Sequence, residues 1–301
     1  MLSQTWASRQ QNPYIPKHDA DVIRLSIEFI KKEALSILML GAIWFLVFLI
    51  ALLPIRLLYI TILWSYFAKI LASTPDKISL TSFPLFLIIS FIVIWLLLYF
   101  LYFIYQTSLF YLIKWFTHKD SATTPWQSTK KAFSKVPHLA TIYFWRIIYA
   151  VLIPFLPYIT GILLSLSWVS PAVSLPLILI WVPLATVYVI YIIVKTSFIV
   201  IYPVEKERWD WNAFFEALDF VKGYWFYVFS ILVVLWIISA LLTNIFSNVA
   251  DFIFNQIENI LLLTLIVKII VGILTFYIWV FFHTWKYFLF KRLEQIKTEK
   301  K

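Results

Sequence analysis

The stretch LFLIISFIVIWLLLYFLYFIYQTSLFYL at residues 85–112 decides the fold class of this 301-residue chain. It contains no charged residue and is longer than the roughly 20 apolar residues that a helix needs to cross a bilayer. Apolar and polar residues do not alternate along it, as they would in a strand of a membrane barrel. The stretch therefore predicts a transmembrane helix. With 62% hydrophobic residues and a mean hydropathy of +0.89, the whole chain is predicted to be an all-α membrane protein.

Apolar runs of similar length recur along the chain and predict a bundle of six transmembrane helices. Their expected ranges are 34–66, 84–112, 139–166, 174–201, 224–247 and 260–285. Pro54 lies inside the first run and is expected to shorten or kink that helix. The chain is thus expected to form one integral membrane domain over residues 1–301. It has an amphipathic cytoplasmic segment at 1–33, the six helices within 34–285 and a basic cytoplasmic tail at 286–301.

Basic residues are distributed unevenly between the predicted connections. Segments 1–33, 114–137, 195–222 and 286–301 hold 20 of the 25 Lys and Arg residues, and these are alternate connections. The positive-inside rule places these segments, and with them both termini, in the cytoplasm. The first 33 residues contain no apolar signal-peptide region. The expected location is therefore the cytoplasmic (inner) membrane of a bacterium.

Carboxylates are absent from all six predicted helices, which removes the usual parts of a proton- or cation-coupled pump. Four basic or titratable residues do fall in these helices: Arg56, Arg146, Lys268 and His283. Snorkelling explains Arg146, and a neutral imidazole at the inner helix end explains His283. Arg56, Arg146 and Lys268 are nevertheless candidate contacts for an anionic lipid, since together in one cavity they would select an anionic ligand.

An internal repeat is visible near the inner ends of the even-numbered helices. Thr107, Thr196 and Thr284 follow one another at 89 and 88 residues. Trp126 and Trp211 each begin a segment in which the next similar residues occur at the same spacing. The pattern predicts three tandem hairpins, each made of a short cytoplasmic helix, an outward helix and a returning helix. Chance similarity among apolar sequences is the alternative.

The short cytoplasmic helices are predicted to be amphipathic, and the one that begins at Thr124 has a basic face and an aromatic face, the pattern of helices that lie in the membrane interface. In the segment that begins at Thr124, Trp126, Thr129 and Phe133 fall on one side and lysines on the other. One interpretation is a surface that senses lipid or docks a partner, and the other is a simple anchor for the next helix. The predicted contact residues of these helices are Trp126, Lys130, Lys131, Trp211, Phe215 and Lys222.

Signatures of enzyme chemistry are missing from the sequence. It contains no HExxH, GxSxG or P-loop motif, and no cysteine. Its histidines, His18, His118, His138 and His283, are too scattered to form a metal set. The protein is therefore expected to have no catalytic residues, no cofactor and no metal. The net charge of +10 follows the membrane helices, which favours anionic headgroups over nucleic acid as its partner.

The region around Pro203 resembles a known family pattern. Tyr202-Pro203-Val204 is followed by Ala217-Leu218 and then by Lys222-Gly223 before the next apolar run. This arrangement resembles YciC-like bacterial inner-membrane proteins and the membrane domain of membrane-anchored glycerophosphodiester phosphodiesterases, over roughly residues 100–250. The resemblance implies a six-span membrane module. It does not imply the phosphodiesterase activity, because no His-Arg pair of the catalytic domain occurs in this chain.

These observations predict a non-enzymatic multi-pass membrane protein that interacts with anionic lipid or with a partner complex, either a different protein or further copies of itself. The alternative is a transporter or exporter of an anionic, lipid-like or amphiphilic solute. A lateral polar cavity reaching Arg146 or Lys268 would favour transport, whereas a filled bundle would favour the non-transporting module.

Overall fold

The computed structural model contains only helices and turns in the part of the chain that it describes, which confirms the all-α class. The described residues are 14–72, 82–118, 124–149, 153, 171–257 and 261–300. The helices, in chain order, are α2 (Asp19–Lys32), α3 (Ala34–Ala72), α4 (Ser82–His118), α5 (Pro125–Phe133), α6 (Val136–Ile147), α8 (Pro171–Lys195), α9 (Ile201–Lys206), α10 (Trp211–Asp219), α11 (Trp225–Ile257) and α12 (Leu261–Glu299).

Four stretches in the described helices are long and apolar enough to cross a membrane. They are Ala34–Leu53 in α3, Val93–His118 in α4, Trp225–Phe254 in α11 and Leu262–Glu299 in α12. The apolar stretch Pro183–Lys195 in α8 is shorter. Most of the expected third transmembrane helix, 139–166, lies outside the described residues. The count of six therefore stays a prediction.

Three helix boundaries differ from the sequence-based expectation. α3 continues through Pro54 as one helix. α8 ends at Lys195, before the predicted limit of 201, because the chain makes a turn over residues 196–200. Residues 286–299 of the expected basic tail, 286–301, are instead the last part of α12. Its apolar residues between the lysines, such as Tyr287 and Phe290, are fully buried, so this segment packs as a helix.

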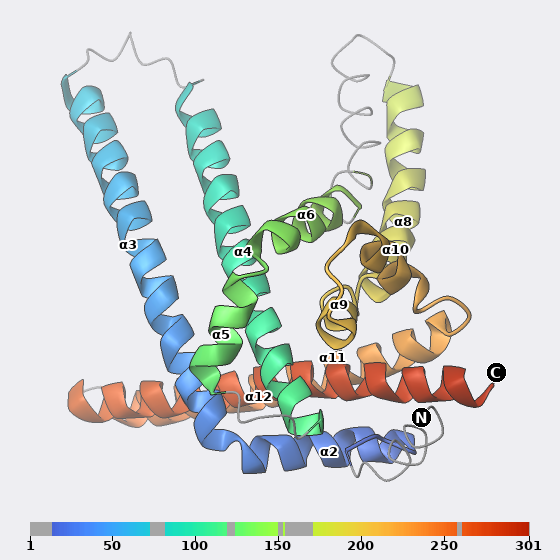
Figure 1. Ribbon diagram of the computed structural model, residues 1–301. Helices are drawn as coiled ribbons and strands as arrows, with labels where there is room; N and C mark the ends of the chain where they lie inside the picture. Colours follow the sequence, from blue (N-terminus) through green and yellow to red (C-terminus); the bar gives the residue numbers. More distant parts are fainter. Residues whose placement is uncertain are drawn as a thin grey trace.

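The long helices diverge from a common layer of short helices (Figure 1). α3 and α4 rise together from this layer, with their far ends apart, and α8 rises beside them. α11 and α12 pack against each other and cross α3 and α4 at a steep angle in the same view. The described helices therefore share their packing near one end, and their far halves expose apolar side chains.

Each short helix of the layer packs on a long helix or its extension. α5 packs against α4, which it follows in the chain, and α10 packs against α9, which extends α8. α2 packs in the same way against α12, although the two lie at opposite ends of the described chain (Figure 1). Each of the three short helices α2, α5 and α10 thus packs on another helix, and the pair α2 and α12 joins the first described helix to the last.

The three threonines of the sequence repeat have the same local environment. Thr107, Thr196 and Thr284 are all buried. Each donates its hydroxyl to the carbonyl four residues earlier, at 2.9, 2.8 and 2.8 Å. This bond satisfies a hydroxyl where apolar side chains surround it. The three threonines therefore share a buried position in the core, where the largest fully buried side chains include Phe29, Phe103, Phe110, Phe198, Phe214, Tyr287 and Phe290.

Candidate functional site

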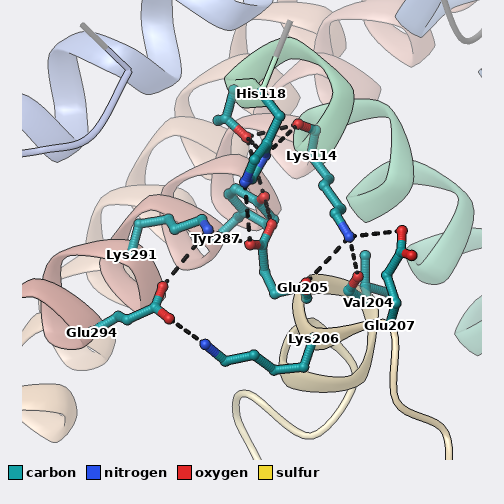
Figure 2. Close-up of polar contacts among 10 residues, drawn as sticks. Lys114, His118, Val204, Glu205, Lys206, Glu207, Tyr287, Lys291 and Glu294 are labelled. Atoms are coloured by element: carbon teal, nitrogen blue, oxygen red, sulfur yellow. Dashed lines mark hydrogen bonds and ion pairs between the residues drawn. The ribbon is translucent and has the colours of Figure 1, made fainter. Parts of the chain in front are cut away.

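A buried carboxylate lies where α4, α9 and α12 meet (Figure 2). The side chain of Glu205, on α9, is only 4% exposed. On α12, the Tyr287 hydroxyl donates a hydrogen bond to it and the Lys291 ammonium group forms an ion pair with it. His118 Nε2, at the end of α4, is 3.9 Å from Glu205 Oε2. Both oxygens of Glu205 therefore accept from protein donors, and this carboxylate links α9 to α12.

A lysine of α4 binds the end of α9. The Lys114 ammonium donates to the carbonyls of Val204 and Glu205, at 2.9 and 3.2 Å, and to Glu207 Oε1 at 3.0 Å (Figure 2). A cation at these terminal carbonyls also complements the negative end of the helix. Glu207 follows α9 with a left-handed φ of 53°, and Lys131 of α5 lies 3.3 Å from its carboxylate. The hydrogen bond from Lys114, helped by the charge of Lys131, lowers the pKa of Glu207.

Further charges extend this network along α12. Glu294 Oε1 lies 2.5 Å from the Lys206 ammonium, and Glu294 Oε2 lies 3.7 Å from Lys291 (Figure 2). We call the whole set the polar junction: Lys114, His118, Glu205, Lys206, Glu207, Tyr287, Lys291 and Glu294. Alternating charges in it join α4, α9 and α12, so its chemistry is that of a clamp between helices. Among the described residues no group of three His, Asp or Glu side chains is placed to hold a metal ion.

Sequence reasoning did not find the polar junction, although the repeat contained a signal for it. Lys114 stands seven residues after Thr107, and Lys291 stands seven residues after Thr284. Each lysine thus follows a buried threonine of the repeat by about two helical turns. Lys291 was assigned to a basic tail, so no buried partner for it was expected. The pairing with Glu205 depends on the turn that follows α8, which no local pattern predicts.

α5 is fixed to α4 by its small residues and exposes its tryptophan. Thr124 caps its start, accepting a hydrogen bond from the Gln127 amide at 3.3 Å. Ser128, Thr129 and Ala132 are buried, and this face packs against α4. The expectation that Thr129 shares a face with Trp126 is therefore wrong, because Trp126 is 64% exposed. The remaining predicted contact residues of α5, Lys130 and Lys131, are also exposed.

α10 has the same division between a buried and an exposed face. Asp210 caps it by accepting from the Ala213 amide at 2.9 Å, and this bond lowers the pKa of Asp210. Ala213, Phe214 and Ala217 form the buried face. Trp211 and Phe215 are exposed, with ring centroids 5.0 Å apart. Lys222, just beyond the helix, is exposed as well.

The three predicted intramembrane cations lie on different helices. Arg56 is exposed on α3. Arg146 is half-buried on α6, with its guanidinium carbon 5.4 Å from the centre of the Phe103 ring. Lys268 is exposed on α12, and its ammonium lies 5.7 Å from the Phe254 ring. The contacts of the described residues do not bring the three cations together.

Comparison of the chain with protein-family models, with curated proteins and with solved structures gave no match in any of the three. The resemblance to YciC-like proteins and to the membrane domain of membrane-anchored phosphodiesterases therefore stays a prediction from the residues around Pro203.

Proposed function

We propose that this protein is a non-enzymatic multi-pass module of a bacterial cytoplasmic membrane, whose layer of short helices contacts anionic lipid headgroups. The observation that carries the proposal is Trp126. It remains 64% exposed on a helix whose opposite face is buried against α4. A tryptophan beside an exposed lysine, here Lys130, is the combination that places a helix at the level of the headgroups.

The second short helix supports the same role. Trp211 and Phe215 are exposed on α10, and Lys222 follows them. The polar junction gives these faces a fixed direction, because Glu207 binds both Lys114 of α4 and Lys131 of α5. Exposed aromatic side chains on α5 and α10 can enter the interface, and each nearby lysine contributes about 1 kcal/mol of attraction to an anionic surface.

The proposed arrangement has six spans in three hairpins, with both termini in the cytoplasm. The shared burial and hydrogen bonding of Thr107, Thr196 and Thr284 support the repeat. The common packing scheme of α2, α5 and α10 supports a short helix at the start of each unit. Lysines concentrate in the layer that the short helices form, and the positive-inside rule assigns such a layer to the cytoplasm.

A depth measurement tests the proposed lipid contact. Because the chain contains no cysteine, a single Trp126→Cys variant can carry one nitroxide label. In vesicles containing phosphatidylglycerol, the label is expected at headgroup depth, judged by its accessibility to oxygen against a water-soluble nickel complex. Ser134→Cys, exposed just after α5, serves as the matched control and is expected to be water-accessible. Equal water accessibility at both positions would contradict the proposal.

Topology is tested separately with a membrane-impermeant maleimide on intact cells. Asn255→Cys, near the end of α11, is expected to react from outside. Lys135→Cys, between α5 and α6, is expected to react only after the cells are permeabilised. Labelling of Lys135→Cys in intact cells would refute the assignment of the short helices to the cytoplasm.

A further inference from the structure

A second polar cluster lies between α4, α6 and α12, and its residues Gln106 and His283 directly precede Thr107 and Thr284 in the chain. At its centre is His283 of α12, whose side chain is 2% exposed. Its Nε2 atom lies 3.0 Å from the Tyr102 hydroxyl and 3.4 Å from Gln106 Nε2, both on α4. The Trp279 ring covers it, with ring centroids 4.0 Å apart. Histidine is thus held in a fixed orientation among aromatic groups.

Two cations accompany this histidine. Lys286 follows His283 by three residues on α12, so the two share a helix face, and the charge of Arg146, on α6, reaches both. Both cations are half-buried. Arg146 stacks over the rings of Phe103 and Tyr99, at 5.4 and 5.9 Å. We call Tyr102, Gln106, Arg146, His283 and Lys286 the cation cluster.

The cation cluster has more donors than the described chain satisfies. Neither Arg146 nor Lys286 forms an ion pair with any described carboxylate. His283 Nδ1 is buried and has no hydrogen-bond partner among the described residues. Positive charge in apolar surroundings is expensive unless an anion compensates it. In the polar junction, by contrast, Lys114 and Lys291 each have a carboxylate partner.

We propose that the cation cluster binds the phosphate group of an anionic membrane lipid. This deepens the proposed function and rests on it for the location of the cluster in the cytoplasmic leaflet. The Arg146 guanidinium matches phosphate oxygens with paired donors, and the Lys286 ammonium adds a point charge. Exposed apolar side chains continue from the cluster: Trp95 and Leu96 on α4 and Phe144 on α6. Acyl chains can lie along these residues, so the anion is a lipid headgroup and not a free phosphate.

Lipid retention by the full-length protein tests this site. Wild type, Arg146→Gln, Lys286→Gln and the control Lys195→Gln, at a half-buried lysine that ends α8, are purified in a mild detergent, and bound lipid is measured by native mass spectrometry. Wild type and the control are expected to retain phosphatidylglycerol, and the two cluster variants to bind it about tenfold more weakly. That is the loss expected for one charge-assisted hydrogen bond. Unchanged retention in both cluster variants, or an equal loss in Lys195→Gln, would overturn the site.

Added ligands distinguish the source of the anion. Delipidated wild-type protein is melted with phosphatidylglycerol, with phosphatidylcholine or with inorganic phosphate. Only phosphatidylglycerol is expected to raise the melting temperature, and the rise is expected to disappear in Arg146→Gln. If inorganic phosphate stabilises the protein equally, the lipid assignment is wrong. Melting in phosphatidylcholine checks that each variant is folded.

Failure of the site and failure of the proposed function give different results. If the nitroxide at Trp126→Cys is water-accessible while Arg146→Gln loses phosphatidylglycerol, the site stands and the interfacial role of the short helices does not. If the label lies at headgroup depth while both cluster variants keep the lipid, the site is refuted and the interfacial role stands.

Discussion

Replacing Glu205 by Gln is expected to destabilise the protein by several kcal/mol. The substitution keeps an acceptor for Tyr287 but removes the charge opposite Lys291, whose side chain is 12% exposed. Breaking a buried ion pair costs about 3–5 kcal/mol, because the remaining charge stays buried without compensation. Lys291 keeps a second carboxylate, Glu294 Oε2 at 3.7 Å. The expected loss is therefore at the lower end, about 3 kcal/mol.

The assay is reversible unfolding in mixed micelles with increasing dodecyl sulfate, followed by circular dichroism. Glu207→Gln is the matched control, since its side chain binds Lys114 but is 59% exposed. Its expected loss is below about 1 kcal/mol, as for other exposed ion pairs. Equal losses in the two variants would refute the reasoning, because burial would then not determine the value of the charge. A loss below about 1 kcal/mol for Glu205→Gln would do the same.

Three further predictions concern helix caps, helix contacts and pH. Asp210→Ala removes the cap of α10 and is expected to cost about 1 kcal/mol in the same unfolding assay. Gly41→Ala places a Cβ 2.7 Å from Phe276 Cζ, so α3 and α12 must adjust. The free energy of unfolding is expected to fall by about 1–3 kcal/mol, and the melting temperature with it. Gly272→Ala, whose Cβ meets nothing within 4 Å, should leave it nearly unchanged. Because the pKa of folded Glu207 lies below 4.5, its contribution is complete above that pH and is lost as the pH falls through the folded pKa. Stability of Glu207→Gln should therefore decline less in acid than that of wild type, which a pH series of melts would show.

The sequence predicted features of this fold that depend on local pattern. Apolar runs longer than a bilayer predict long helices wherever they occur, and Thr124 and Pro125 correctly predict the start of α5. The spacing of Thr107, Thr196 and Thr284 identified three positions that are all buried. Such patterns are read within one segment, and they do not require knowledge of the neighbouring helix.

Features that depend on tertiary contacts were not predictable in this way. The amphipathic pattern of α5 identified an apolar face with Trp126, yet the buried face is made of small residues such as Ser128 and Ala132. Close approach of α5 to α4 favours small side chains, which a hydropathy pattern undervalues. Glu205 lies outside the six predicted helices. Its buried ion pair is with Lys291, 86 residues away, and no local pattern indicates that partner.

The contact between α2 and α12 has a consequence for the order of assembly. α5 and α10 can pack as soon as they are made, since each follows the helix that receives it. α2 must wait, because its partner α12 is the last helix of the described chain. Until then the apolar face of α2, formed by Val22, Leu25 and Phe29, has only part of its packing, such as the contact of Phe29 with Phe116 of α4. Its amphipathic pattern allows that face to rest on the membrane surface meanwhile. The amphipathic pattern that suits α2 to the interface therefore protects its apolar face until α12 is in place.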